Sequence, residues 1–259
     1  MKSTLCLLLA SLMTSTVTAA TPPVPPDAQK RPHEVKAPFG ATRNDDYYWL
    51  RDDTRENKDM LAYLQAENAY ADQLLAPLKP LEDTLYKEIV GRIKQDDASV
   101  PARERGYWYY SRFETGQDYP IHARRKGSME APEEVLLDVN TMAAGKGYFN
   151  VGSMDVSQDN QLLAWADDDV GRRQYTIRFK DLRTGKVLPD VITGSSGDLV
   201  WADDNRTVLY VENDPETLLT VRVKKHVLGT PASADTVVYE EKDDSFYMGI
   251  GRTRDDRFI

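Results

Sequence analysis

The stretch Asp155–Asp169, which reads DVSQDNQLLAWADDD, decides how the rest of this sequence is interpreted. Its polar residues 157–160 lead into a short apolar run at 162–166, and that run ends in acidic residues. Asp and Asn tolerate the backbone angles of tight turns, and a short apolar run after such a turn is typical of a β-strand. The stretch therefore predicts a turn followed by a buried strand.

The same pattern recurs twice further along the chain. It returns at 202–212 as ADDNRTVLYVE and begins again at 254–259 as RDDRFI. Asp204 follows Asp159 by 45 residues and precedes Asp256 by 52. An internal repeat of this period with several strands per unit predicts the blades of a β-propeller. On this pattern alone, a β-sandwich with regularly spaced hairpins is the alternative.

The composition is that of an ordinary globular protein with an acidic balance. The 259 residues are 41% hydrophobic and 29% charged, with a net charge of −9. This length allows one large domain or two smaller ones. Because nucleic-acid binding requires a basic face, the diffuse acidic charge argues against a nucleic-acid partner.

Residues 1–20 have the features of a secretory signal peptide. Lys2 supplies the positive start, 5–13 is a short apolar run, and small residues at 17–20 form a cleavage site. The apolar run is too short to span a bilayer. We therefore expect cleavage after Ala19 or Ala20 and export to the bacterial periplasm. Cys6, the only cysteine, would be removed with this segment, so no disulfide is expected in the mature chain.

The next part of the chain divides into a tether and a helical segment. Residues 21–36 are rich in proline and predict an extended tether. Residues 37–98 contain apolar residues at helical spacing, which predict helices over 57–75 and from Pro80 to about 93. The switch to strand patterns falls at 96–101, so 99–259 is expected to be a partial β-propeller.

Strands are expected throughout that second region. The alternation and turn residues predict strands at 106–113, 119–125, 135–139, 162–166, 174–182, 187–192, 199–201, 207–211, 219–227, 236–239 and 246–250. These make about three blades, whereas closed propellers have about four to eight. The fold expected is therefore mainly β: an incomplete β-propeller preceded by an α-helical segment, interrupted within a blade where the sequence ends.

No catalytic residue can be assigned from the motifs. A serine hydrolase of the α/β type needs a G-x-S-x-G elbow, and Gly194-Ser195-Ser196-Gly197 lacks that spacing, so it is expected to be a loop between blades. His33, His122 and His226 lie in the tether, within a strand and at a strand end, and a structural role is favoured for each over that of a general base.

Metal and cofactor motifs are equally weak. The acidic groups 167–169, 203–204 and 243–244 lack the calcium-loop pattern, so solvated turn caps are favoured over calcium ligands. Gly249-Ile250-Gly251 is not a dinucleotide loop and is expected on a strand. The pairs Arg124-Arg125 and Arg172-Arg173 could bind a carboxylate or pair across an interface, but solvated or local pairing is favoured. No catalytic, cofactor-binding or metal-binding residue is assigned, and no cofactor is expected.

Three separated segments are distinctive: RNDDYYWLRDD at 43–53, LQAENAYAD at 64–72 and GYWYYSRFETGQDYPIHARRKG at 106–127. In this order they resemble the N-terminal region of the prolyl oligopeptidase family of serine peptidases. The doubled aromatics, the ETGQDYP run and the Arg124-Arg125 pair are closer to the oligopeptidase B branch than to prolyl oligopeptidase itself. The resemblance covers about 31–259.

This resemblance implies a two-domain peptidase in which a seven-bladed propeller gates an α/β-hydrolase domain. In the family, the early helices pack on the catalytic domain, which carries the serine, aspartate and histidine and, in the oligopeptidase B branch, cleaves short peptides after Arg or Lys. None of those positions lies in this sequence. The chain is therefore expected to lack activity alone, with exposed apolar surface and a tendency to aggregate.

The leading hypothesis is the gating portion of a secreted oligopeptidase B-like peptidase, whose partners are short basic peptides and a separately encoded catalytic domain. The alternative is a periplasmic propeller-like binding module that recognises a peptide or protein, with the helices as an interaction arm. A propeller glycosidase is a third possibility, and it would require two carboxylates converging on a cleft. No membrane span is expected.

Overall fold

The structure is a computed structural model that describes residues 22–259. The predicted signal peptide at 1–20 lies outside these described residues. The chain separates into two compact units, the first ending at Ile93 and the second comprising Lys94–Ile259. This division falls slightly before the predicted boundary at 98.

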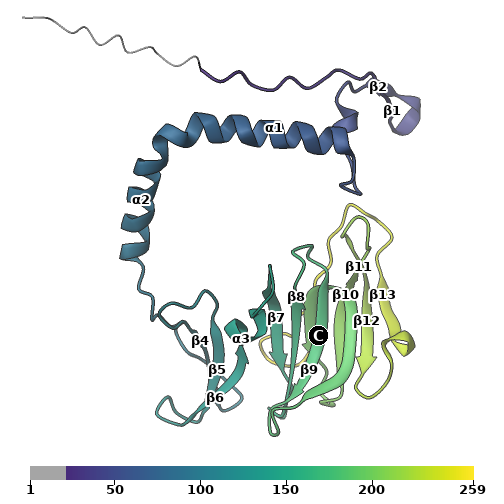
Figure 1. Cartoon of the computed structure of the whole chain (residues 1–259). Helices are drawn as coiled ribbons and strands as arrows, with labels where there is room; N and C mark the ends of the chain where they lie inside the picture. The colour runs from purple at the N-terminus through teal and green to yellow at the C-terminus, as the bar shows by residue number, and fades with distance from the viewer. Residues whose placement is uncertain (1–21) are drawn as a thin grey trace, which may run out of the picture. The chain divides into compact units, whose positions relative to one another are not determined.

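The first unit contains the two predicted helices (Figure 1). Helix α1, Lys58–Leu75, begins after Asn57, whose Oδ1 accepts hydrogen bonds from the backbone N–H groups of residues 59 (3.0 Å) and 60 (3.2 Å). The 3₁₀ turn η3, Ala76–Leu78, follows, and helix α2, Lys79–Arg92, has Pro80 in its first turn. The helix prediction is confirmed. The capping residue and the prolines lie at the helix ends, where the apolar periodicity begins and stops.

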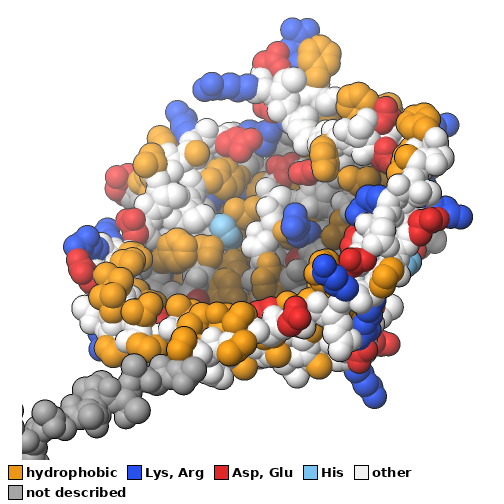
Figure 2. All heavy atoms as spheres, turned by 90° about the horizontal axis from the view of Figure 1, so that it is seen from above, with side chains coloured by type: hydrophobic (Ala, Val, Ile, Leu, Met, Phe, Trp, Pro, Cys, Tyr) orange, Lys and Arg blue, Asp and Glu red, His pale blue; other side chains and the backbone are white. Residues whose placement is uncertain are grey.

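The apolar stripe of these helices is exposed. The side chains that keep more than a third of their surface exposed are Leu61, Leu64, Leu74, Leu75, Leu78, Leu81, Leu85, Tyr86, Ile89 and Ile93. In the described unit only Met60 of α1 is buried. In the space-filling view, hydrophobic side chains, shown in orange, lie at the surface among charged ones (Figure 2). Helices with this pattern normally cover a partner surface.

The predicted tether is shorter than expected. Strand β1, Glu34–Lys36, pairs antiparallel with β2, Thr42–Asn44, around the 3₁₀ turn η1, Pro38–Gly40. A second 3₁₀ turn, η2, is Tyr48–Leu50. Its Trp49 donates a hydrogen bond to the carbonyl of residue 29 (2.9 Å), and Arg31 lies 4.4 Å above the same ring. Aromatic residues thus bind the end of the proline-rich segment, which the composition alone did not show.

The second unit is built from two antiparallel sheets. The four-stranded sheet has the order β3-β4-β5-β6, and the seven-stranded sheet has the order β13-β12-β11-β10-β9-β8-β7. The strands are β3 Ala102–Glu104, β4 Tyr107–Arg112, β5 Ile121–Lys126, β6 Glu133–Asp138, β7 Asn150–Val156, β8 Leu162–Asp168, β9 Tyr175–Asp181, β10 Val187–Trp201, β11 Thr207–Asn213, β12 Thr220–Val227 and β13 Thr236–Glu240. Helix α3, Val139–Ala143, precedes β7, and the 3₁₀ turn η4, Ala232–Ala234, precedes β13.

Strand β10 belongs to two blades. Its first half pairs with β9, ending at Ser195, and its second half pairs with β11 from Ser195 onward. The seven-stranded sheet is therefore two four-stranded blades that share one bent strand, and with β3–β6 the unit contains three blades. The predicted loop at 194–197 is wrong: these residues form the bend inside β10, where Gly194 (φ 72°) and Gly197 (φ 101°) permit backbone angles that side chains rarely adopt.

The repeated turn is the same structure in three copies. A backbone hydrogen bond closes each turn, from Asn160 to the carbonyl of 157 (2.8 Å), from Asn205 to 202 (3.4 Å) and from Asp256 to 253 (2.9 Å). The donor residue has positive φ in each copy: 63°, 54° and 59°. The residue before it caps the turn, and in the third copy that residue is Asp255 rather than the predicted Asp256. The repeat is confirmed, but the interval between its second and third copies is one residue shorter than predicted, because Asp255 and not Asp256 is equivalent to Asp204.

Other differences concern strands that lack periodicity or a partner. Strands β3 and β7 and helix α3 were not predicted, because each is short or mostly polar. The predicted strand at 246–250 is absent from the described residues, so Gly249-Ile250-Gly251 does not lie on a strand. This segment runs beside the third blade, where the backbone N–H of Met248 donates to the Thr220 hydroxyl (2.8 Å), but no strand pairs with it.

The core lies between blades. One buried cluster joins the second and third blades and includes Phe179, Trp201 and Tyr210. A smaller one joins the first and second blades through residues of β6, β7 and β8. Ile177 and Phe179 of β9 are fully buried, as their alternation with polar residues predicted.

Candidate functional site

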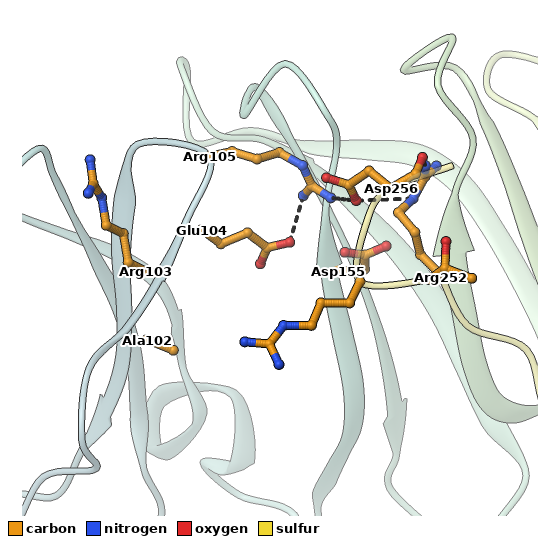
Figure 3. Close-up of a pocket in the computed structure, with 9 residues that line it drawn as sticks. Ala102, Arg103, Glu104, Arg105, Asp155, Arg252 and Asp256 are labelled. Carbon is orange, nitrogen blue, oxygen red and sulfur yellow. Dashed lines mark hydrogen bonds and ion pairs between the residues drawn. The ribbon is translucent and has the colours of Figure 1, made fainter. Parts of the chain in front are cut away.

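A charged pocket lies where the first strands of the blades end. Its volume is about 490 Å³, and we call it the arginine–aspartate pocket. Its lining residues are Ala102, Arg103, Glu104, Arg105, Asp155, Arg252, Thr253, Arg254 and Asp256. Figure 3 shows that these side chains come from β3 and the turn after it, from β7, and from the last segment of the chain. Three separate parts of the unit therefore contribute to one site.

Arg105 is placed by the tight turn between β3 and β4. Arg105 and Gly106 both have positive φ, 42° and 83°, which is the type I′ geometry of a two-residue hairpin. The guanidinium Nη1 lies 2.9 Å from Glu104 Oε1, and Nη2 lies 2.9 Å from Asp256 Oδ1. The second contact joins residues 151 positions apart and connects the turn of the first blade to the third copy of the repeated turn.

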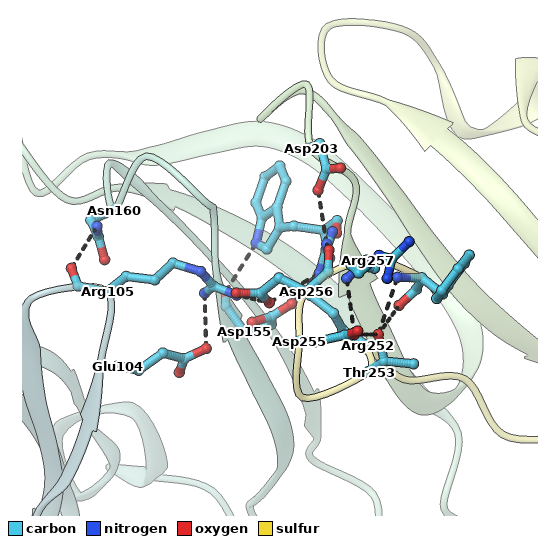
Figure 4. Close-up of polar contacts among 12 residues, drawn as sticks. Glu104, Arg105, Asp155, Asn160, Asp203, Arg252, Thr253, Asp255, Asp256 and Arg257 are labelled. Atoms are coloured by element: carbon cyan, nitrogen blue, oxygen red, sulfur yellow. Dashed lines mark hydrogen bonds and ion pairs between the residues drawn. The ribbon is translucent and has the colours of Figure 1, made fainter.

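Arg252 is held still more tightly. Its Nη2 donates to the carbonyl of Trp201 (2.7 Å), and its Nη1 donates to Asp203 Oδ1 (2.8 Å) and to the carbonyl of Asp256 (2.9 Å) (Figure 4). Only 10% of its side-chain surface is exposed. The guanidinium therefore lies in a fixed orientation, at the end of β10 and beside the repeated turn.

Asp155 connects two blades at the same place. Its Oδ2 accepts a hydrogen bond from the backbone N–H of Trp201 (3.0 Å), and its carbonyl accepts one from the indole N–H of Trp201 (3.0 Å). Burial raises the pKa of the Asp155 carboxyl, and the negative charge of Glu104 acts in the same direction. The charged form of this carboxylate is thus disfavoured.

The lining of the pocket consists mainly of guanidinium and carboxylate groups. The one hydroxyl in the lining belongs to Thr253, and it donates to Asp255 (2.7 Å), while the lining includes no histidine. Fixed guanidinium and carboxylate groups bind charged ligands by paired hydrogen bonds. Among the described residues, no group of three or more His, Cys, Asp or Glu side chains could hold a metal ion.

The three histidines lie in different places. His33 stacks on Tyr48 with ring centroids 4.0 Å apart, and His122 Nδ1 lies 2.8 Å from the Ser111 hydroxyl. Burial lowers the pKa of His122, and no carboxylate contacts its ring among the described residues. His226 is buried between Asp235 (2.7 Å) and Asp190 (3.3 Å). Within the second unit, His122 and His226 have different partners, and neither lines the arginine–aspartate pocket.

The serines of the 194–197 segment are structural. Ser195 is fully buried, and its hydroxyl accepts a hydrogen bond from the backbone N–H of Gly197 (3.0 Å). Ser196 donates to Asp198 (3.2 Å). No histidine contacts either hydroxyl in the described part of the chain.

The acidic groups and arginine pairs correct one expectation. Asp167 and Asp168 are buried instead of solvated: Asp167 bonds Arg178 and Trp165, and Asp168 accepts backbone N–H groups of the following turn. Arg124, paired with Glu134 (2.9 Å), is also buried. Of the two alternatives favoured for the arginine pairs, solvated or locally paired, Arg124 is locally paired.

Sequence reasoning missed the residues of the arginine–aspartate pocket. The only signal was the third copy of the repeated turn, which contains Arg254 and Asp256 and was used only to identify the fold. Nothing in the order of residues connects Arg105 or Asp155 with that turn.

No helix in the described part of the chain is both long and apolar enough to cross a membrane.

Comparisons with known proteins extend the fold to a family. Residues 26–259 match the family model described as "Prolyl oligopeptidase, N-terminal beta-propeller domain". The chain is 64% identical to "Dipeptidyl aminopeptidase BI" of Pseudoxanthomonas mexicana over all of its own length and 38% of that relative, and 33% identical to "Protease 2" of Moraxella lacunata over 88% of its length and 33% of that relative. It superposes on oligopeptidase B from Leishmania major with a TM-score of 0.84 and 32% identity, covering 90% of this chain and 35% of that one.

The chain thus spans about a third of the length of these relatives. The match covers the blades and the helices before them. The chain belongs to the prolyl oligopeptidase family and contains sequence of its N-terminal β-propeller domain.

Proposed function

We propose that this chain is the gating propeller portion of a secreted serine-type peptidase that hydrolyses short peptides, and that it has no peptidase activity alone. The observation that carries this proposal is the set of three blades that end around a charged pocket with no nucleophile–histidine pair. The exposed stripe of α1 and α2 supports it, since such a stripe would cover a catalytic domain.

Two substrate specificities are proposed. The first is cleavage after Arg or Lys, as the resemblance to oligopeptidase B implied, and the likeness to the Leishmania major enzyme supports it. The second is release of dipeptides, which the name of the Pseudoxanthomonas mexicana relative suggests; the 64% identity along the whole chain favours it. A binding module without catalysis is the remaining alternative.

A chimaera tests these proposals. The segment of the Pseudoxanthomonas mexicana relative that matches this chain is replaced by residues 26–259 of this chain, so that the rest of the relative is kept, and hydrolysis is measured on two fluorogenic substrates. One has a blocked N-terminus and a single arginine before the reporter, and the other is a dipeptide with a free N-terminus. We expect an active chimaera. Because it shares the catalytic domain of the native relative, a change of preference relative to that native enzyme reports what this chain contributes to specificity.

The chain by itself supplies the matched control. We expect it to cleave neither substrate at a rate that persists through a second purification step. Cleavage by the chain alone would contradict the assignment of catalysis to another domain. If the chimaera is inactive while the native relative is active in the same assay, the binding module is favoured.

Export is proposed from the sequence of residues 1–20. The chain is expressed in a Gram-negative host, the periplasm is separated from the cytoplasm, and the N-terminus is sequenced. We expect a periplasmic product beginning at Ala20 or Thr21. A cytoplasmic product that keeps Met1 would overturn this proposal.

A further inference from the structure

The lining of the arginine–aspartate pocket contains more cationic than anionic side chains. It contains four arginines and three acids. The acids have partners: Glu104 and Asp256 pair with Arg105, and Asp155 is bonded to Trp201. Arg103 and Arg254 have no ion-pair partner among residues 22–259. Arg252 pairs with Asp203, and Figure 3 shows that the Arg103 side chain extends away from the other labelled residues of the pocket. Arg254 is therefore the guanidinium of this pocket that has no carboxylate partner among the described residues.

Two buried donors in the same walls also lack an acceptor. The described residues include three buried side-chain nitrogen or oxygen atoms without a hydrogen-bond partner, and two of these are Nε of Arg105 and Nε of Arg252. A buried N–H of a charged group without an acceptor is costly, so each such atom calls for an explanation, and a bound water, ion or ligand is one of them. Both atoms are donors, and Nε of Arg252 lies 4.0 Å from Oδ1 of Asp256, which is too far for a hydrogen bond.

The pocket is also preorganised for an anion. Arg105 and Arg252 are held by carboxylates and backbone carbonyls, so little conformational entropy remains to be lost when a ligand binds. Guanidinium groups pair with carboxylates through two parallel hydrogen bonds. A volume of about 490 Å³ accommodates the end of a peptide and excludes a folded chain.

The strand beside the pocket favours a peptide over a small ion. Strand β3 is an edge strand that pairs only with β4, and its three residues are exposed. An edge strand presents backbone donors and acceptors that an extended peptide can bind. Charged side chains and a free backbone edge therefore lie side by side.

We propose that the arginine–aspartate pocket binds the C-terminal carboxylate of a short peptide, with Arg254 as its principal counter-ion and Arg105 and Arg252 as fixed neighbours. This inference rests on the proposed function, because a gating propeller of a peptidase encounters peptides. It adds a recognition site outside the catalytic centre, and this site binds the C-terminal carboxylate of the peptide rather than its side chains. It predicts that peptides with a free C-terminus are retained in preference to blocked ones.

The test measures binding directly. Fluorescence anisotropy follows N-dansyl-Ala-Ala-Ala, as the free acid and as the C-terminal amide, against the full chain at low concentration and low salt. We expect saturable binding of the free acid and at least about tenfold weaker binding of the amide, since a charge-assisted contact is lost. Equal binding of the two peptides would overturn the proposal.

Variants test the assignment of Arg254. Arg254→Gln is expected to weaken binding of the free acid by about tenfold. Arg254→Lys is expected to weaken it less, because lysine keeps the positive charge and loses only the two parallel N–H donors of the guanidinium. Arg257→Gln is the matched control, since Arg257 lies on the same turn, outside the pocket lining and beside Phe258. Equal effects of Arg254→Gln and Arg257→Gln would overturn the assignment. Circular dichroism verifies that each variant is folded, and the comparison of acid with amide does not depend on any variant.

Two further ligands identify the source of the carboxylate. If inorganic phosphate displaces the peptide at equal concentration, the pocket binds anions in general, and the proposal that it recognises a peptide is overturned. An amidated peptide with an internal glutamate that binds as tightly as the free acid would overturn recognition of the terminus. An inactive chimaera together with selective binding of the free acid would reject the proposed function and leave this site standing.

Discussion

The Nδ1 atom of His226 lies 2.7 Å from Oδ1 of Asp235, and both side chains are almost completely buried. The other ring nitrogen faces Asp190 at 3.3 Å, and the hydroxyl of Tyr210 donates to the second oxygen of Asp235 (2.9 Å). Asp190 lies in the part of β10 that pairs with β9, whereas His226 lies in β12 of the third blade. This polar cluster therefore holds two blades together inside an otherwise apolar core, where Phe179 stacks on the imidazole.

Replacing this histidine is expected to be strongly destabilising. His226→Gln leaves two buried aspartates without their shared partner, and removing one member of a buried charged cluster costs about 3–5 kcal/mol of unfolding free energy. Urea unfolding followed by tryptophan fluorescence measures the change. The control is His33→Gln, an exposed position in the first unit, where a change within about 0.5 kcal/mol is expected. Equal effects at the two sites would contradict the role given to His226.

The second prediction concerns acid stability and Asp168. Burial disfavours the charged form of this carboxyl, but hydrogen bonds from the backbone N–H groups of the turn that follows outweigh burial and lower its pKa below the ordinary 3.8. Because the folded-state pKa is the lower one, the stabilisation is complete above about pH 4 and is lost as the pH falls through the folded value. Acidification to pH 3 should therefore remove part of the stability.

The variant Asp168→Asn tests this linkage. It is expected to lower the unfolding free energy at pH 7 by about 1.5–3 kcal/mol and to lose less on acidification than the unaltered chain. Urea midpoints at pH 7 and pH 3 provide the measurement. Asp169→Asn is the neighbouring control, because Asp169 is exposed and pairs with Lys146 at the surface. If Asp168→Asn and the unaltered chain lose the same stability between the two pH values, the hydrogen-bonded carboxylate is not the cause.

A third prediction concerns the close approach of Tyr175 to the first strands of two blades. A Cβ atom on Gly152 would lie 2.5 Å from the Tyr175 ring, and one on Gly197 would lie 3.1 Å from it. Gly152→Ala must displace the ring, whose hydroxyl accepts a hydrogen bond from Asn150 (3.0 Å). We expect the unfolding free energy, measured by thermal unfolding, to fall by about 1–3 kcal/mol.

Gly147→Ala is the matched control for Gly152→Ala. No atom lies within 4 Å of the added Cβ, and its φ is not in the left-handed region. Because alanine reduces the freedom of the unfolded chain, this variant should be unchanged or more stable by up to about 1 kcal/mol. A Gly152→Ala variant as stable as Gly147→Ala would show that the tyrosine moves freely.

The fourth prediction concerns the exposed stripe of α2. Leu85→Gln combined with Ile89→Gln removes two exposed apolar side chains without altering the helix termini. If this stripe drives self-association, the association constant from sedimentation equilibrium should fall by about tenfold or more, since burial of such side chains supplies the driving force. Lys87→Gln on the same helix is the control and should leave association unchanged. Equal association of both variants would place the self-associating surface elsewhere.

Local chemistry explains which elements were predictable. Asn57 and the prolines at 77 and 80 mark the helices, and alternation identifies β9, because capping and periodicity act over a few residues. The recurring turn was equally visible, although its register in the third copy depends on which aspartate accepts the backbone hydrogen bonds. The strand expected at 246–250 was wrong, because a strand needs a pairing partner as well as suitable residues.

The sequence by itself determined the helices, most strands, the repeated turn and the resemblance to a peptidase family, since each depends on residues that are neighbours in the chain. Only the tertiary structure decided that β10 serves two blades, that His226 lies between Asp190 and Asp235, and that Arg105 meets Asp256. Contacts between residues so far apart in the sequence depend on how blades pack. The physical reason is that turns and periodicity specify each blade locally, whereas the pocket exists only after the ends of separate blades converge.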